Sequence, residues 1–105
     1  MAMKIEFSFD DKLMGEKGIK GDDVYYTLKK KFASKGLKCV SDNDVLAFED
    51  VGNENDYGNM WAIILALVEC DWFVECATAC NFYENGKRED VLSQVPEMKH
   101  IMATA

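Results

Sequence analysis

The sequence predicts one α+β domain spanning residues 1–105, with the ferredoxin-like order βαββαβ and a short additional helix at the C-terminus. Apolar residues alternate with polar ones near the N-terminus and again in the last third of the chain. Between these segments lie a stripe of apolar residues at helical spacing and a long apolar segment. We therefore expect an antiparallel sheet with two helices on one face, and a chain of 105 residues has room for one hydrophobic core.

A strand and a helix are predicted first. In residues 3–9 the apolar side chains have a period of two, which indicates a strand with one buried face. Residues 10–21 contain three glycines and several charges, which favours a surface loop. Asp22 is a candidate N-cap for a helix that ends at Gly36. The apolar stripe of this helix comprises Val24, Tyr25, Leu28 and Phe32.

A hairpin and a second helix follow. Residues 37–40 and 45–50 are predicted strands, and the polar residues 41–44 between them favour a turn because such side chains bond to their own backbone. Asp56 is a candidate N-cap for a helix that runs to about Glu69. Residues 60–68 are all apolar, so this helix is expected either to be sandwiched inside the protein or to present one side to a partner.

The last third of the chain predicts a long strand and a broken helix. Residues 72–83 alternate between a face with Cys76 and Cys80, expected to be buried, and an opposite face. Asn85 and Gly86 form a turn signal. A final helix is expected from about Arg88, interrupted at the only proline, Pro96, because proline lacks the N–H and clashes with the preceding turn.

Composition argues against several classes of protein. The formal net charge is −7 and Arg88 is the only arginine, which is unlike a nucleic-acid-binding surface. The longest apolar run, residues 60–68, has about half the length of a membrane-spanning helix, and the N-terminus does not resemble a signal peptide. These features predict a cytoplasmic protein that binds neither nucleic acid nor membrane.

No catalytic residue, metal ligand or cofactor is predicted. The four cysteines, Cys39, Cys70, Cys76 and Cys80, are expected to be reduced, and a thiol buried in a core is unreactive. The only histidine, His100, lies near the C-terminus. The cysteine spacing lacks the paired ligands of a zinc site, and the acidic segment of residues 49–56 does not match a calcium-binding EF-hand loop.

A candidate interaction surface follows from the predicted strand of residues 72–83. Phe73, Glu75 and Tyr83 fall on the face that no helix is expected to cover. Trp61, on the apolar second helix, is a further candidate because tryptophan is common at the centre of interfaces. The alternative is a sheet face open to solvent and a tryptophan in the core.

Three functional hypotheses remain open at this point. The first is a non-enzymatic, acidic protein-interaction or regulatory domain that associates with itself or binds a basic protein partner. The alternative is a small-molecule-binding domain, with an aromatic-lined pocket between sheet and helices or at a dimer cleft. Such a pocket could be lined by Tyr25, Tyr57, Trp61 and Trp72. The third is an enzyme that uses Asp and Glu, or Cys39 or Cys70.

Overall fold

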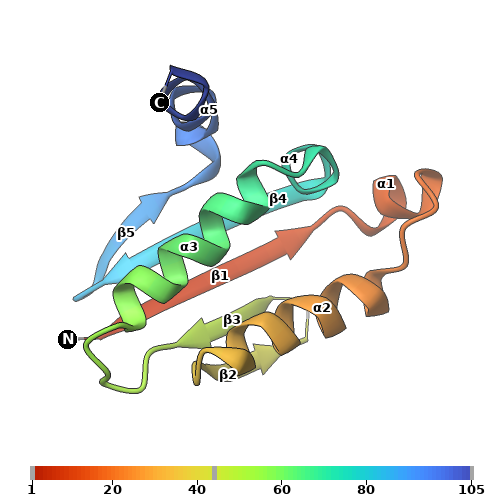
Figure 1. Cartoon of the computed structure of the whole chain (residues 1–105). Coiled ribbons are helices and arrows are strands. Elements are labelled where there is room, and N and C mark those ends of the chain that lie inside the picture. Colours follow the sequence, from red (N-terminus) through yellow and green to blue (C-terminus); the bar gives the residue numbers. More distant parts are fainter. Residues whose placement is uncertain (1, 44, 105) are drawn as a thin grey trace.

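The computed structural model describes residues 2–43 and 45–104, and Figure 1 shows the arrangement of the chain. The strands are β1 (Met3–Phe9), β2 (Lys38–Asp42), β3 (Leu46–Glu49), β4 (Ala77–Glu84) and β5 (Lys87–Asp90). The helices are α1 (Asp11–Glu16), α2 (Gly21–Ser34), α3 (Asp56–Val68), α4 (Asp71–Cys76) and α5 (Val95–Thr104), with a 3₁₀ turn, η1, at Leu92–Gln94.

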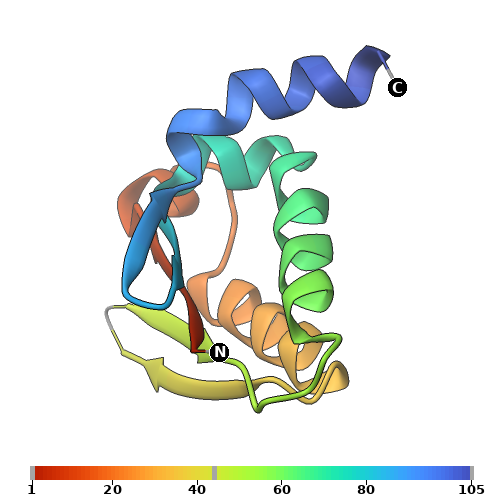
Figure 2. The ribbon, with the colours of Figure 1, turned by 90° about the vertical axis from the view of Figure 1, so that its left-hand side faces the viewer.

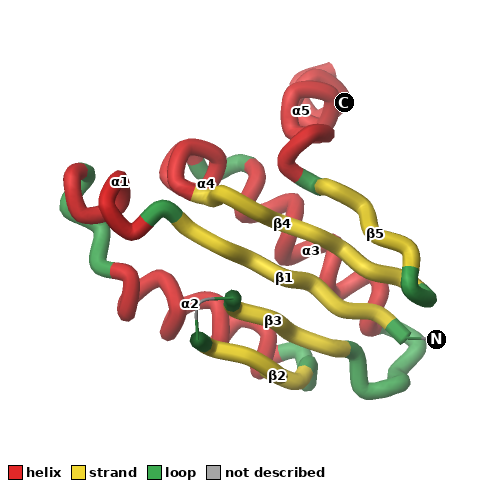
Figure 3. Tube along the Cα trace, turned by 180° about the vertical axis from the view of Figure 1, so that it is seen from behind, coloured by secondary structure: helices red, strands yellow, loops and turns green. Residues whose placement is uncertain are grey.

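The strands form one sheet in the order β2-β3-β1-β4-β5, and every neighbouring pair is antiparallel. Helices α2 and α3 lie on the same face of this sheet (Figure 2), whereas the opposite face, seen in Figure 3, is bare of helices in the described part of the chain. The prediction of an α+β chain with an antiparallel sheet is therefore confirmed.

The simple βαββαβ order is not what the structure has. Strand β5 extends the sheet at the edge beyond β4, and the short helices α1 and α4 are inserted before α2 and after α3. Helix α5 leaves the edge of the sheet and runs across one end of the molecule, beside α4 (Figure 2). The ferredoxin-like prediction therefore misses one strand and two helices.

The core is built around the ring of Phe7 on β1. Its centroid lies 6.0 Å from Phe32 on α2, 6.4 Å from Phe48 on β3 and 6.0 Å from Phe73 on α4. Phe32 and Phe48 stack on each other with centroids 3.9 Å apart. All of these rings are fully buried. Each such aromatic pair adds about 0.5–1.5 kcal/mol to the free energy gained from burial alone.

The segment predicted as a loop, residues 10–21, contains helix α1. Asp10 caps this helix, because its Oδ1 accepts a hydrogen bond from the backbone N–H of Leu13 at 3.0 Å. Met14 is the buried residue that ties the short helix to the core. The sequence did not predict this helix, because its glycines and charges favour a loop and only Met14 and the partly buried Leu13 attach it to the core.

The ends of α2 are formed differently from one another. Lys20, not Asp22, occupies the N-cap position, and it makes no side-chain cap. At the other end Gly36 has a φ of +76°, its N–H donates to the Ala33 carbonyl, and the Leu37 N–H donates to the Phe32 carbonyl. This pair of bonds is the Schellman motif, which requires a left-handed residue and so favours glycine. The prediction that Gly36 ends the helix is confirmed.

The single strand predicted for residues 72–83 is wrong in its first half. Residues Asp71–Cys76 form α4, and β4 begins only at Ala77. Phe73 and Cys76 are the buried residues of α4, and their spacing of three is the spacing of a helix. Over so short a stretch of mostly apolar residues, the periods of two and of 3.6 are hard to distinguish.

The hairpins follow their turn signals. Strands β2 and β3 pair as predicted, although residue 44 of their turn lies outside the described residues. Asn85 and Gly86 both have positive φ, 53° and 82°, and connect β4 to β5, a strand the sequence analysis missed. Pro96 does not interrupt a helix but lies in the first turn of α5, where its missing N–H costs nothing.

We expect Phe7→Ala to lower the free energy of unfolding by about 3–5 kcal/mol, because it removes a ring from the centre of the aromatic core. Tyr26→Ala, at an exposed aromatic of α2, is the control and is expected to change stability by no more than about 0.5 kcal/mol. Urea denaturation of both variants measures the difference. Equal losses would contradict this account of the core.

Candidate functional site

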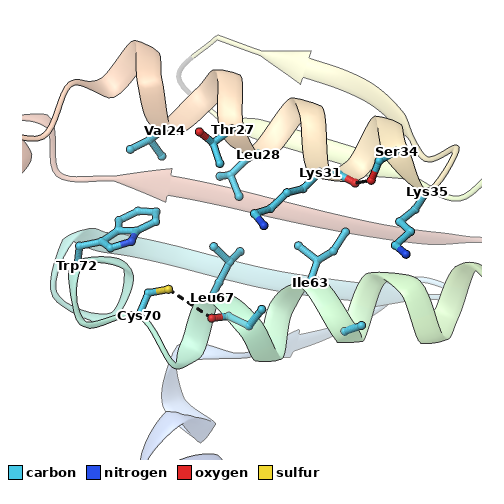
Figure 4. A pocket seen from close by; sticks show the side chains of 12 residues that line it. Val24, Thr27, Leu28, Lys31, Ser34, Lys35, Ile63, Leu67, Cys70 and Trp72 are labelled. Atoms are coloured by element: carbon cyan, nitrogen blue, oxygen red, sulfur yellow. Dashed lines mark hydrogen bonds between the residues drawn. The ribbon is translucent and has the colours of Figure 1, made fainter.

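A groove lined mainly by apolar side chains lies between α2 and α3 (Figure 4). It encloses about 420 Å³, a volume within the range of about 300–1,000 Å³ that is usual for small-molecule sites. One wall is α2, the other is α3 with the residues that follow it, and α4 contributes Trp72 at one end.

The floor of the groove is aliphatic and its rims are small or polar. Four buried side chains form the floor: Val24 and Leu28 from α2, and Ile63 and Leu67 from α3. The rim on the α3 side consists of Ala62 and Ala66, both exposed. The rim on the α2 side consists of Thr27, Lys31, Ser34 and Lys35. All lie at spacings of three or four along their helices, so each helix turns one continuous stripe toward the groove.

Small side chains keep the groove open. Ala62 and Ala66 end at Cβ, and across from them Thr27 and Ser34 are scarcely longer. Larger residues at these positions would meet across the gap and close it, as side chains do between packed helices. The floor residues themselves are nearly buried, with Val24 and Ile63 7% exposed and Leu28 and Leu67 less.

The charge of the groove differs in sign from that of the chain. Lys31 and Lys35 line it, and no Asp or Glu is among its lining residues, although the sequence carries 19 acidic residues and a net charge of −7. Neither amine forms an ion pair within the described residues, in contrast to Lys29 of the same helix, whose Nζ lies 3.3 Å from Asp42 Oδ2. The rim therefore presents two unpaired cations.

The end of the groove away from Lys35 carries the aromatic ring of Trp72 (Figure 4). Trp72 is partly buried there, next to Cys70, whose Sγ donates a hydrogen bond to the Ala66 carbonyl at 3.4 Å. Of the four aromatic residues expected to line a pocket between sheet and helices, only Trp72 lines this groove. Tyr25 contacts Phe9 instead, and Tyr57 and Trp61 lie against Phe82 on the other flank of α3.

The four residues of the candidate interaction surface lie in different parts of the structure. Phe73 is fully buried in the core. Glu75, on α4, forms an ion pair with Lys17, which raises the pKa of that lysine. Tyr83 lies on the helix-free face of the sheet, 4.9 Å from the Lys4 amine, and a hydrogen bond with Glu6 raises its pKa. Of the three residues predicted for the sheet face, only Tyr83 lies there, while Trp61 lies on α3, the second predicted helix.

The cysteines divide into buried and accessible thiols. Cys76 and Cys80 are fully buried, and burial, aided by the negative charge of Asp90, raises the pKa of Cys80 from its ordinary value of 9.0 to about 12. A thiol with such a pKa stays protonated at neutral pH and is a poor nucleophile. Cys39 is exposed and Cys70 is partly buried in the groove. His100 lies on α5.

The acidic segment of residues 49–56 uses Asp56 to organise its own backbone. Asp56 is buried, and its Oδ2 accepts hydrogen bonds from the N–H groups of Val51 at 2.8 Å and Asn53 at 3.1 Å. Asn55, not Asp56, occupies the N-cap position of α3. Within residues 2–43 and 45–104, no group of three or more His, Cys, Asp or Glu side chains is placed to hold a metal ion. Over the same residues, no helix has both the length and the apolar content to cross a membrane.

Comparison with models of protein families gave no match to this chain. Comparisons with curated proteins and with solved structures gave none either. The function is therefore argued from the geometry of the groove.

We expect the four cysteines to react with Ellman's reagent in the order of their exposure. Cys39 should react first and Cys70 more slowly, whereas Cys76 and Cys80 should react only after unfolding in urea. Mass spectrometry of the labelled peptides identifies each site. Labelling of Cys80 in the native protein as fast as that of Cys39 would contradict the placement of its thiol in the core.

Proposed function

We propose that this chain is a non-enzymatic binding domain whose groove between α2 and α3 holds an apolar small molecule. The observation that supports this proposal is the floor of four aliphatic side chains beneath an open groove of about 420 Å³. Burial of apolar surface contributes roughly 25 cal/mol per Å², so a ligand gains affinity by covering the apolar atoms of the floor, of the two rim alanines and of Trp72. Pockets of this kind are mainly apolar with a few placed polar groups.

The non-enzymatic part of the proposal rests on the side chains that line the groove. They include no Asp, Glu or His within the described chain, so neither Cys70 nor Ser34 has a side-chain base beside it. The Ser34 hydroxyl also donates a hydrogen bond to the Lys31 carbonyl at 2.7 Å. A hydroxyl or thiol without a base is a weak nucleophile, and binding is then the simplest use of the site.

We expect Ala66→Phe to weaken the binding of a neutral fluorescent probe, N-phenylnaphthylamine, by at least about tenfold, because the new ring would occupy the groove. Ala33→Phe is the matched control, since Ala33 is an exposed alanine of α2 that does not line the groove. Probe fluorescence in a titration measures both affinities.

Two results would count against this function. One is the absence of saturable probe binding to the parent protein, and the other is equal binding by the two phenylalanine variants. Circular dichroism verifies that both variants keep their helices, because phenylalanine is a weaker helix former than alanine at either position.

A second candidate function, binding of a basic protein partner, is favoured by the opposite flank of α3. Tyr57, Trp61 and Leu65 lie at spacings of four, and Tyr57 and Leu65 are 48% and 39% exposed. Acidic residues border this stripe: Glu69 is one turn further along, and Glu89 is the cross-strand neighbour of Phe82, against which Trp61 packs. An apolar stripe with an acidic border is complementary to a basic amphipathic helix.

For this second function we expect a synthetic amphipathic helix of leucine and lysine to bind at low salt and to bind less tightly at high salt. Leu65→Ala should weaken binding by about tenfold, the effect of roughly 1.4 kcal/mol of lost contact. Val51→Ala, at another exposed aliphatic residue away from the stripe, is the control. The fluorescence of Trp61 gives the readout. Peptide binding that changes neither with salt nor with Leu65→Ala would contradict this function.

A further inference from the structure

We infer that the ligand of the groove is an elongated amphipathic anion, a free single-chain carboxylate, with its head at Lys31 and Lys35 and its tail toward Trp72. This inference rests on the proposed binding function of the groove and adds the chemical class and the direction of the ligand. It follows from three properties of the groove: its charge, its polarity from end to end, and its size.

The two unpaired lysines of the rim indicate that the ligand is negatively charged. Where a cation has no protein partner, an anion of the ligand can supply one, and a hydrogen bond between charged groups is roughly twice as strong as a neutral one. Lys31 and Lys35 are separated by one helical turn on the same rim, so both amines can reach one carboxylate. The acidic residues on the rest of the chain would repel a ligand with its charge elsewhere.

Because α2 and α3 run antiparallel, the two ends of the groove are lined by different kinds of residue. Figure 4 places Trp72 and Cys70 at one end of the groove and Lys35 and Ser34 at the other, with the aliphatic floor between them. From Val24 to Lys35 the helix rises about 16 Å at roughly 1.5 Å per residue. Lys31 lies between these two ends, so the charged part of the groove extends from its middle to Lys35 (Figure 4). A single alkyl chain with its tail toward Trp72 and its charged end in this part of the groove matches the arrangement.

The volume of the groove and the number of its lysines favour a free single-chain ligand over a lipid bilayer. Membrane surfaces are usually recognised by clusters of roughly four to eight basic residues, and this groove has two. The net charge of −7 would also oppose approach to an anionic membrane. A volume of about 420 Å³ accommodates a small molecule rather than a headgroup with two acyl chains.

The first experiment compares dodecanoate with dodecanol by displacement of the neutral probe at low salt. We expect dodecanoate to bind about fivefold to tenfold more tightly, from two partly exposed ion pairs. Removing one methylene from the tail should weaken binding by up to about fourfold. Raising the salt concentration should reduce the advantage of dodecanoate and leave dodecanol unchanged.

The matched variants are Lys31→Gln with Lys35→Gln, against Lys30→Gln. Lys30 is exposed on the same helix, has no ion pair within the described chain and does not line the groove. The double variant should bind dodecanoate as weakly as dodecanol, whereas Lys30→Gln should retain the preference for the carboxylate. Lys30→Gln should also bind the neutral probe as tightly as the parent protein, because Lys30 does not line the groove. For the double variant the internal reference is dodecanol, so the readout is the ratio of the two affinities measured on the same protein.

The direction of the ligand is tested with bromine, which quenches the fluorescence of a nearby tryptophan. Dodecanoate brominated at its terminal carbon should quench more strongly than dodecanoate brominated beside the carboxylate. Trp72→Phe should abolish this difference, and Trp61→Phe should keep it, since Trp61 lies on the other flank of α3.

The outcomes separate this inference from the proposed function. If dodecanol binds as tightly as dodecanoate, or the double variant keeps the preference for the carboxylate, the groove is an apolar site and the anionic ligand is wrong. If the protein binds vesicles of anionic lipid but not free dodecanoate, a membrane surface takes its place. Stronger quenching by bromine beside the carboxylate reverses the direction. If neither the probe nor either compound binds, the proposed function fails as well.

Discussion

Phe7 lies on the central strand, opposite Leu46 of β3 and Cys80 of β4, and its ring contacts α2 through Phe32 and α4 through Phe73. Aromatic pairs on either side of β1 then hold the two long helices. Phe32 stacks on Phe48 and keeps α2 over β3, while Trp61 packs on Phe82 and keeps α3 over β4. Because each helix is attached to its own half of the sheet, β1 runs between them in Figure 1, and the groove forms above this line.

Within the described residues, three of the 19 acidic residues of the chain bind backbone N–H groups. Asp10 caps α1, and Asp56 binds two N–H groups of its own loop. Asp50 accepts a hydrogen bond from the Met3 N–H at 2.9 Å and so joins the loop after β3 to the start of β1. These three carboxylates therefore have a structural role in the loops and the short helix of the chain. The groove differs from the rest of this acidic chain because two lysines and no carboxylate line it, and the proposed ligand chemistry follows from them.

Local patterns predicted most of the elements correctly where a period extended over enough residues. The alternation in β1, the apolar stripe of α2 and the glycine that ends it are all present in the structure. The errors fall on short segments. The six residues of α4 are too few to distinguish a helix from a strand, and α1 is attached to the core by only Met14 and the partly buried Leu13. Strand β5 is polar throughout, so its pairing with β4 depends on the turn at Asn85 and Gly86.

The sequence by itself determined the α+β class, the burial of Cys80 and the position of the second helix, because these depend on spacings within one segment. Cys76 is buried as expected, but in helix α4 rather than on a strand. It also raised a pocket between sheet and helices as one of three hypotheses, but it assigned three aromatics to that pocket that lie elsewhere. Only the tertiary structure decided that residues 24–35 and 62–72 face each other, with two lysines on one rim and two alanines on the other. A helical period says which residues share a face, but the partner of that face is set by the packing of distant segments on the common core.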